Sequence, residues 1–173
     1  MGVPAEVEEV FRTEYARVVG GLTLFVGDRG VAEELAQEAF VRLCQHWEHV
    51  RGHDRPGAWV QRVAINLARS SYRRTRAERR ALERSRSAAP RVLEPGDHSP
   101  SSVTREALLR LPEDERAVVI LRFFGDLSVL ETAEALRIPE GTVKTRSRRA
   151  LASLRSMGLI AESEVPDAIQ DTR

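Results

Sequence analysis

The stretch SVLETAEALRIPEGTVKTRSRRALASL, residues 128–154, decides the fold of the C-terminal part of the chain. Ser128 and Glu131 have the spacing of a capping box, in which each side chain satisfies a backbone N–H at the start of a helix. A short turn at Arg137 follows, and Pro139, placed at the first helical position, starts a second, basic helix. This order is typical of a helix-turn-helix, whose second helix lies in the major groove of DNA.

The second helix of this motif has an apolar side and a basic side. Helical spacing turns four apolar residues toward the core: Val143, Ala150, Leu151 and Leu154. The outward side chains are Lys144, Thr145, Arg148 and Arg149. Lysine and arginine reach guanine O6 and N7, and the amides near Gly141 and Thr142 are placed to hold a phosphate at the helix N-terminus. The pattern predicts binding to duplex DNA, with a merely solvated basic helix as the alternative.

Positive charge is segregated along the chain, although the formal net charge is only +1. Residues 51–91 carry a net charge of +9 and residues 137–155 carry +5, whereas the segments around them are net negative. Neutralising phosphates requires local positive charge, so this layout favours two separate contacts with a polyanion. The alternative is a basic surface that is only solvated.

The bulk properties indicate a soluble chain of one or two domains. Its 173 residues are 42% hydrophobic and 31% charged, which is ordinary for globular proteins. No apolar run approaches the roughly 18 residues of a membrane span, and the acidic N-terminus lacks the basic start of a signal peptide. The single cysteine, Cys44, excludes an internal disulfide framework and fits a reducing compartment. We therefore expect a cytoplasmic protein without membrane contact.

Three helices are predicted in the N-terminal half. The first follows the apolar spacing Val7, Phe11, Tyr15, Val18 and Leu22. The second runs from about residue 31 to 49, with the apolar stripe Ala36, Phe40, Leu43 and Trp47. The third runs from about residue 58 to 74, and its second face carries Trp59, Arg62, Asn66, Arg69 and Arg73. Such a face suits an unpaired base and its backbone, although a packed tryptophan beside solvated arginines gives the same pattern.

The composition shifts to serine, proline, arginine and glycine from about residue 84 to 101, which is typical of a flexible connection. Beyond it, a short helix closes at Leu111 before Pro112, and the next helix has a predicted buried stripe of Ala117, Ile120, Leu121 and Phe124. No strand-like alternation appears. The predicted fold is all-α, with two helical domains joined by a flexible linker and the helix-turn-helix in the second.

Four motifs in order resemble those of the extracytoplasmic-function (ECF) sigma factors of RNA polymerase. AEELAQEAF at residues 32–40 resembles the region 2 motif A-E-D-L-V-Q-E-x-F, and AWVQRVAINLA at 58–68 resembles W-L-x-R-I-A-x-N. LPEDER at 111–116, followed by ETAE at 131–134 and IPEGTVK at 138–144, resembles region 4. The resemblance covers roughly residues 11–74 and 102–155. It implies a region 2 domain at 1–84, a linker at 85–101, a region 4 domain at 102–156 and a tail at 157–173.

The resemblance implies a factor that binds the polymerase core, recognises −10 and −35 promoter elements and starts transcription of a specific set of genes, without covalent chemistry. Glu34, Gln37, Glu38 and Arg42 would dock on the clamp helices of the polymerase, and the flap is a further polymerase contact. The Trp59 helix would help to melt the −10 element and hold a flipped base near Asn66. The basic side of the last helix, with Gly141 and Thr142, would read the −35 element. An anti-sigma factor is a candidate partner, and no cofactor, metal or small-molecule substrate is implied.

Three residues depart from the family pattern. Arg137 occupies a turn position where glycine is usual, which predicts a positive φ and some strain. Ser147 replaces an apolar residue on the inner face of the last helix, so its hydroxyl needs a partner such as a carbonyl one turn back. Leu130 is apolar where the family is usually polar.

Other interpretations remain at this point. Cys44, His46, His49 and His53 have ligand types that suit zinc, but their spacing would require a specific fold-back, so surface histidines are favoured. Neither clustered catalytic carboxylates, nor a phosphate-binding glycine loop, nor a nucleophile motif points to an enzyme. The more serious alternative is a stand-alone helix-turn-helix regulator that never binds the polymerase core.

Overall fold

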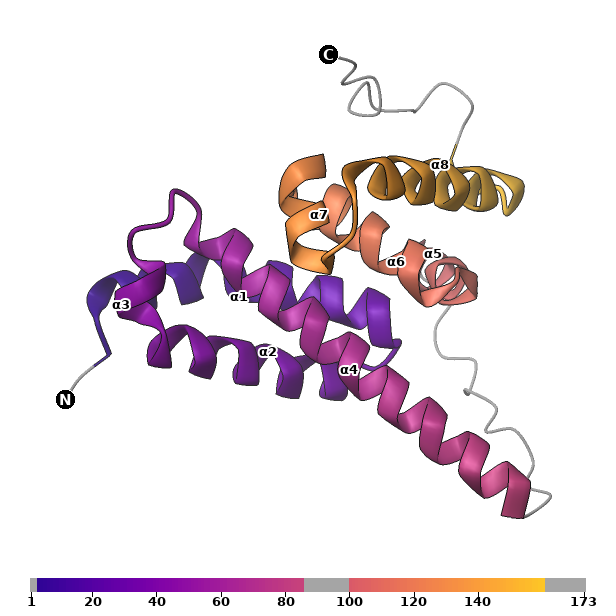
Figure 1. Ribbon diagram of the computed structural model, residues 1–173, viewed down its shortest axis with the longest axis horizontal. Helices are drawn as coiled ribbons and strands as arrows, with labels where there is room; N and C mark the ends of the chain where they lie inside the picture. Colours follow the sequence, from indigo (N-terminus) through magenta and orange to yellow (C-terminus); the bar gives the residue numbers. More distant parts are fainter. Residues whose placement is uncertain (1–2, 86–99, 161–173) are drawn as a thin grey trace.

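The structure is a computed structural model that describes residues 3–85 and 100–160, with side chains described outside 79–85 and 100–102. Within these ranges every regular element is helical (Figure 1). We call α1–α4 the N-terminal domain and the elements from α5 to α8 the C-terminal domain. Most of the predicted linker and tail lies outside the described residues. The prediction of an all-α fold with two helical domains is confirmed.

The N-terminal domain packs α1 (Ala5–Val26), α2 (Arg29–Gln45), the short α3 (Trp47–Val50) and α4 (Pro56–Ser85) around an apolar core. The helix α1 ends at Gly27, whose φ of 84° is accessible to glycine without strain. Asp28 then caps α2, because its carboxylate accepts a hydrogen bond from the backbone N–H of Val31. The predicted stripe on α2 is buried as expected.

Two predicted helix boundaries in this domain were wrong. The helix expected over residues 31–49 breaks at His46, whose φ of −108° and ψ of 13° separate α2 from α3. The third helix does not stop near residue 74 but continues to Ser85. Residues 75–85 lack apolar periodicity, yet they are rich in alanine, glutamate and arginine and contain no glycine or proline, so intrinsic helix propensity extends α4.

The C-terminal domain contains α5 (Pro100–Arg110), α6 (Glu113–Val119), the π-helical turn η1 (Ile120–Phe124), α7 (Val129–Leu136) and α8 (Glu140–Ser156). The predicted capping box is present at α7. The Ser128 hydroxyl accepts a hydrogen bond from the N–H of Glu131 at 3.1 Å, and the Glu131 carboxylate accepts one from the N–H of Ser128 at 2.6 Å. Pro139 is the N-cap of α8 instead of its first helical residue, a shift of one position.

The π-helical turn changes one predicted core residue. The N–H of Gly125 donates to the carbonyl of Ile120, five residues back, at 2.7 Å. This wider winding turns residues out of the register that a 3.6-residue repeat predicts. Ala117, Ile120 and Leu121 are buried as expected, but Phe124 is 40% exposed.

The two domains share one continuous apolar core, which the sequence did not indicate. A single buried cluster contains Leu22 and Ile65 of the N-terminal domain together with Leu121 and Leu127 of the C-terminal domain. Figure 1 shows the C-terminal domain lying over α1 and α4, with α2 on the far side of these helices. The connection that was expected to be flexible therefore joins two domains that lie in direct contact.

Three glycines allow this close approach. A Cβ added at Gly20 or Gly21 of α1 would lie 3.0 Å or 3.3 Å from the Phe124 ring. A Cβ at Gly125 would lie only 2.1 Å from Oε1 of Gln61 on α4. These positions lack side chains where the domains meet, so the contact is closely packed.

Arg137 gives a test of the local fold. It caps the C-terminus of α7 with φ 54° and ψ 50°, the left-handed conformation that the departure from glycine predicted. That conformation costs an L-residue roughly 1 kcal/mol, part of which glycine offsets through its larger unfolded-state entropy. We expect Arg137→Gly to raise the free energy of unfolding by about 0.5 kcal/mol in urea denaturation. Arg137→Ala removes the same side chain but keeps Cβ, so an equal gain from alanine would contradict this account.

Candidate nucleic-acid interface

The helix-turn-helix presents a basic surface to solvent. On α8 the predicted inner residues Val143, Ala150, Leu151 and Leu154 are buried, and they fix which side of the helix faces outward. Ser147 is also buried, at 4% exposure. The predicted DNA-facing residues are exposed or half-buried: Gly141, Thr142, Lys144, Thr145, Arg148 and Arg149. The Thr145 hydroxyl donates to the carbonyl of Gly141 at 2.8 Å, and Leu130 on α7 is 55% exposed.

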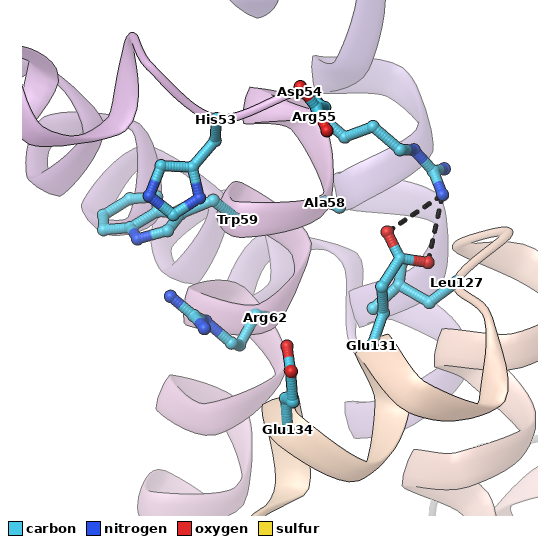
Figure 2. A pocket seen from close by; sticks show the side chains of 9 residues that line it. All are labelled: His53, Asp54, Arg55, Ala58, Trp59, Arg62, Leu127, Glu131 and Glu134. Atoms are coloured by element: carbon cyan, nitrogen blue, oxygen red, sulfur yellow. Dashed lines mark hydrogen bonds and ion pairs between the residues drawn. The ribbon is translucent and has the colours of Figure 1, made fainter.

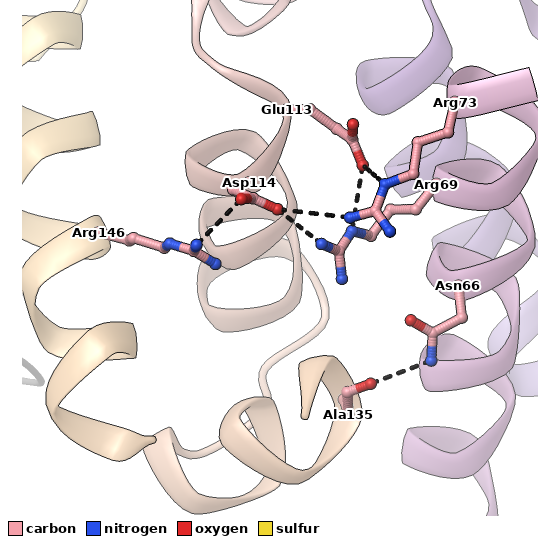
Figure 3. Close-up of polar contacts among 7 residues, drawn as sticks. All are labelled: Asn66, Arg69, Arg73, Glu113, Asp114, Ala135 and Arg146. Carbon is pink, nitrogen blue, oxygen red and sulfur yellow. Dashed lines mark hydrogen bonds and ion pairs between the residues drawn. The ribbon is translucent and has the colours of Figure 1, made fainter. Parts of the chain in front are cut away.

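The second predicted surface, on α4, lies against the C-terminal domain but is not fully covered by it, because Asn66 and Arg73 remain exposed (Figure 3). The amide of Asn66 donates to the backbone carbonyl of Ala135, at the end of α7, at 3.0 Å. Arg69 donates to Asp114 at 2.6 Å and to Glu113 at 3.3 Å. Both carboxylates belong to the first turn of α6. The amide and guanidinium groups expected to contact DNA thus hold protein acceptors instead.

Asp114 joins three arginines from the two domains. One of its oxygens faces Arg69 and, at 3.9 Å, Arg73, while the other accepts from Arg146 of α8 at 2.9 Å (Figure 3). Arg73 also pairs with Glu113 at 3.3 Å. The side chain of Arg69 is only 11% exposed, so solvent screens its pairs less than a surface salt bridge. Through the carboxylate of Asp114, the network links the α4 surface to α8.

Trp59 and Arg62, the remaining predicted α4 residues, line a cavity of about 250 Å³ between the domains. Figure 2 shows His53 among the residues that line the cavity with Trp59, and Glu134 of α7 reaches toward Arg62. Both Trp59 and Arg62 are half-buried. The cavity combines an aromatic wall with basic and acidic groups. Glu131 and Glu134 come from the C-terminal domain, whereas Asp54 comes from the N-terminal domain.

Arg55, in the loop before α4, closes the edge of this cavity. Its guanidinium contacts both carboxylate oxygens of Glu131 at 3.1 Å and donates to the carbonyl of Asp126 at 3.0 Å (Figure 2). Burial raises the pKa of Glu131, but the hydrogen bonds from Ser128 and the charge of Arg55 outweigh it, so that pKa lies below its ordinary value of 4.5. Glu131 therefore caps α7 and joins the two domains with the same carboxylate.

A buried arginine also spans the domains. Arg116 of α6 is 2% exposed and donates to the backbone carbonyl of Phe25 in α1 at 2.8 Å. Its guanidinium carbon lies 5.0 Å from the Phe25 ring centroid and 5.4 Å from that of Tyr72 on α4. Cation–π contacts and the carbonyl compensate for part of the cost of burying this charge.

The residues predicted to bind polymerase lie on α2, away from the C-terminal domain (Figure 1). Glu34, Gln37 and Glu38 are exposed, and Arg42 is half-buried. The sequence suggested that this face has no internal partner, but Arg42 donates to Glu38 at 2.8 Å, one turn away on the same helix. This face of α2 stays accessible to a partner, and the Glu38–Arg42 ion pair lies at one end of it.

The candidate zinc ligands do not converge in the described part of the chain. No group of three or more histidine, cysteine or acidic side chains there is placed to hold a metal ion. The ring centroids of His49 and His53 lie 6.3 Å apart, and the His46 ring lies 6.2 Å from the Trp59 ring at a tilt of 54°. None of the helices over residues 3–85 and 100–160 is long and apolar enough to cross a membrane.

Sequence reasoning missed the groups that cover α4. In the sequence Glu113 and Asp114 stand out only as part of LPEDER, and Glu131 only as a helix cap and as the first residue of ETAE. The acidic segment that contains them, set between the two basic ones, was the available signal. Nothing local in the sequence shows which surface this acidic segment contacts.

Known proteins match this chain over both domains. It is 32% identical over 155 residues to the RNA polymerase sigma-E factor of Streptomyces coelicolor, covering 90% of this chain and 87% of the relative. It is 33% identical over 144 residues to the ECF RNA polymerase sigma factor SigW of Bacillus subtilis, covering 75% and 76%. The families described as sigma-70 region 2 and sigma-70, region 4 match residues 10–78 and 103–154. The chain belongs to the ECF sigma factors.

This sigma factor binds the RNA polymerase core and promoter DNA. Because both regions match, it is not the stand-alone regulator that the sequence left open. Its fold is similar to that of the sigma factor RpoE in complex with the anti-sigma factor NepR from Bartonella quintana, with a TM-score of 0.71 and 18% identity over 92% of this chain and all of that one. It is also similar to CnrH in complex with the cytosolic domain of CnrY, with a TM-score of 0.61 and 21% identity over 88% of this chain and 87% of that one.

The lowered pKa of Glu131 predicts a pH-dependent contribution to stability. A carboxyl group whose pKa falls on folding stabilises the native state above its unfolded pKa, and this stabilisation is lost as the pH falls through the folded value. We expect Glu131→Gln to lower the free energy of unfolding at pH 7 by about 0.5–1 kcal/mol, a modest loss because the pair with Arg55 is partly solvated. In urea denaturation the difference should shrink below pH 4.5. Glu134→Gln on the same helix is the control, and a Glu131→Gln difference that is independent of pH would contradict the assignment.

Proposed function

We propose that this sigma factor divides promoter recognition between its domains, with α4 acting on the −10 element and α8 on the −35 element. One observation supports the first assignment above others. In the structure Asn66, Arg69 and Arg73 already bind two carboxylates and a carbonyl, which offer the same acceptor chemistry as phosphates and base edges. The surface is therefore built to hold anions and acceptors.

The Trp59 end of α4 suits a base that has left the duplex. Trp59 and Arg62 flank the cavity of about 250 Å³, and an aromatic wall with a guanidinium beside it is the chemistry that holds an unstacked base. We assign the holding of a flipped −10 base to Trp59, with Asn66 farther along α4 on the same face. Arg69 and Arg73 then follow the strand backbone.

The exposed side of α8 suits the major groove of a duplex. Arg148 and Arg149 are exposed, as is Thr145 one turn earlier. Arginine pairs with guanine edges, and Gly141 with Thr142 places the first backbone amides of α8 toward a phosphate. We assign the reading of the −35 element to these side chains together. Insertion of α8 into the major groove sets which bases they meet.

For polymerase binding we propose the exposed face of α2, through Glu34, Gln37, Glu38 and Arg42 with the clamp helices, while the C-terminal domain contacts the flap. The domains extend over residues 1–84 and 102–156, with a linker at 85–101 and a tail at 157–173. We place the protein in the cytoplasm, where the polymerase works, and assign it no enzymatic activity. The two similar structures contain anti-sigma factor NepR and the cytosolic domain of CnrY, so a protein of the anti-sigma kind is a proposed partner here too.

The two DNA surfaces should fail in different ways. On a promoter selected from random DNA with the holoenzyme, we expect Arg149→Ala to weaken binding to a duplex carrying the −35 element about tenfold. Trp59→Ala should leave duplex binding nearly unchanged and slow strand opening about tenfold, measured by permanganate reactivity of −10 thymines. Arg110→Ala, an exposed arginine on α5, is the control. If both variants lost only duplex affinity, the division between the domains would be wrong.

The polymerase surface is tested separately. We expect the double variant Glu34→Ala with Gln37→Ala to lower the affinity for purified core polymerase about tenfold in a fluorescence titration, since a few central residues dominate such interfaces. Glu48→Ala, an exposed carboxylate on α3, should bind as the native chain does. Unchanged affinity in the double variant would move the polymerase contact off this face of α2.

A further inference from the structure

We infer that the C-terminal end of α4 binds the phosphates of duplex DNA in the spacer between the −10 and −35 elements. The residues that make this contact are Arg76, Arg80 and Arg84, which we call the spacer stripe. This assignment rests on the proposed function of α4 and α8, because those two surfaces determine which DNA lies beside the end of α4. The contact is independent of base sequence, since arginine neutralises a phosphate whatever base it carries.

The end of α4 has no role in the apolar core. The helix continues to Ser85, whereas the match to the sigma-70 region 2 family ends at residue 78. Every residue from 73 to 78 is exposed, and Figure 1 shows this end of α4 projecting beyond the other helices. Residues 73–85 carry six arginines against two glutamates, a net charge of +4. A projecting helix with this charge is a surface for a polyanion.

The arginines of the spacer stripe extend a row that begins on the −10 surface. The row has intervals of four, three, four and four residues: Arg69, Arg73, Arg76, Arg80 and Arg84. At 3.6 residues per turn, this spacing keeps the five backbone positions within an arc of about 80°. Glu78 lies on the opposite side of the helix and pairs with Arg74 at 3.9 Å. Glu83 borders the row near its end, so the spacer stripe keeps a net charge of +2.

The order of the sites along the chain places this row beside the spacer. Arg69 and Arg73 are assigned to the backbone of the −10 strand, and the spacer stripe follows them on the same face. From Arg73 to Arg84 the helix rises about 16 Å, roughly the length of five base pairs. The chain then leads to the C-terminal domain, whose α8 is assigned to the −35 element. The DNA beside the spacer stripe therefore lies upstream of the −10 element, on the side of the −35 element.

The composition of this segment fits a duplex better than a single strand. Residues 73–85 contain no aromatic side chain, so they offer no surface on which an unpaired base stacks. Trp59, which does offer one, lies at the other end of α4. Phosphates of a duplex, in contrast, need only positive charge at the correct spacing. The two ends of α4 thus suit the two states of DNA at the upstream edge of an opened promoter.

A pair of matched variants tests the spacer stripe in the holoenzyme, assembled from core polymerase and the full chain. Arg76→Ala with Arg80→Ala removes two charges from the row. The control, Arg74→Ala with Arg79→Ala, removes two charges from the same turns of α4 at positions outside the row. Alanine preserves the helix in both, which circular dichroism checks.

The DNA probes are two fork junctions that carry the −10 element as a single strand. In the short fork the upstream duplex ends at the −10 element, and in the long fork it continues into the spacer without reaching the −35 element. The affinity of each holoenzyme for both forks is measured over a range of salt concentrations. Because the polymerase contributes the same contacts to every holoenzyme, the difference between the two variants isolates the spacer stripe.

We expect the native holoenzyme to bind the long fork about tenfold more tightly than the short fork. The Arg76→Ala, Arg80→Ala variant should lose most of this gain. Its slope of log affinity against log salt concentration on the long fork should be shallower by about 2, one for each lost phosphate contact. The control should keep both the gain and the slope.

The outcomes distinguish this inference from the proposed function. Equal behaviour of the two variants on the long fork overturns the spacer stripe. A loss of affinity for core polymerase in the Arg76→Ala, Arg80→Ala variant alone overturns it too, because the arginines then face an acidic protein surface. If the native holoenzyme binds the short fork no better than a fork with a scrambled −10 element, the assignment of α4 to the −10 element fails instead.

Discussion

The buried guanidinium of Arg116 is the constraint on which the arrangement of the two domains depends. A charge at 2% exposure must be compensated, and its hydrogen bond and ring contacts come from α1 and α4, while the arginine itself belongs to α6. Neither domain satisfies this group alone. Leaving it buried without those partners would be strongly destabilising, so the domains either meet in this geometry or separate far enough for water to reach the guanidinium.

Around this centre the interface changes character. Apolar contacts near Leu22, Ile65 and Leu121 form the buried apolar part of the interface, whereas the surrounding ion pairs are partly open to solvent. Such a polar rim adds specificity and salt sensitivity more than affinity. The result is a contact with a defined geometry whose outer ion pairs weaken as the ionic strength rises.

Local patterns in the sequence predicted the local parts of the structure. The capping box at Ser128, the positive φ at Arg137 and the buried stripe of α2 each depend on residues within one or two helical turns, so their spacing was informative. The exposure of Phe124 was not predictable, because one π-helical turn shifts the register without changing the composition. The C-terminal extension of α4 depends on helix propensity alone, and the spacing of apolar residues gives no sign of it.

The sequence predicted which residues of α4 form the candidate site, but not which groups of the C-terminal domain contact them. The face from Trp59 to Arg73 was identified because its side chains recur every three or four residues. Its partners Glu113 and Asp114 lie more than forty positions later in the chain, as the separations of 44 and 45 residues from Arg69 show. Contacts at such separations leave no periodic trace in a single sequence, so the cover over α4 became visible only in three dimensions.

The adjacent glycines Gly20 and Gly21 have a consequence for α1 itself. Glycine within a helix costs about 1 kcal/mol relative to alanine, because its backbone is freer when unfolded and exposes more of its peptide groups to water. In the structure Phe124 lies against both positions and Ile120 against Gly21, and they shield the backbone there. The packing of the C-terminal domain therefore also protects α1 at the place where its own helix propensity is weakest.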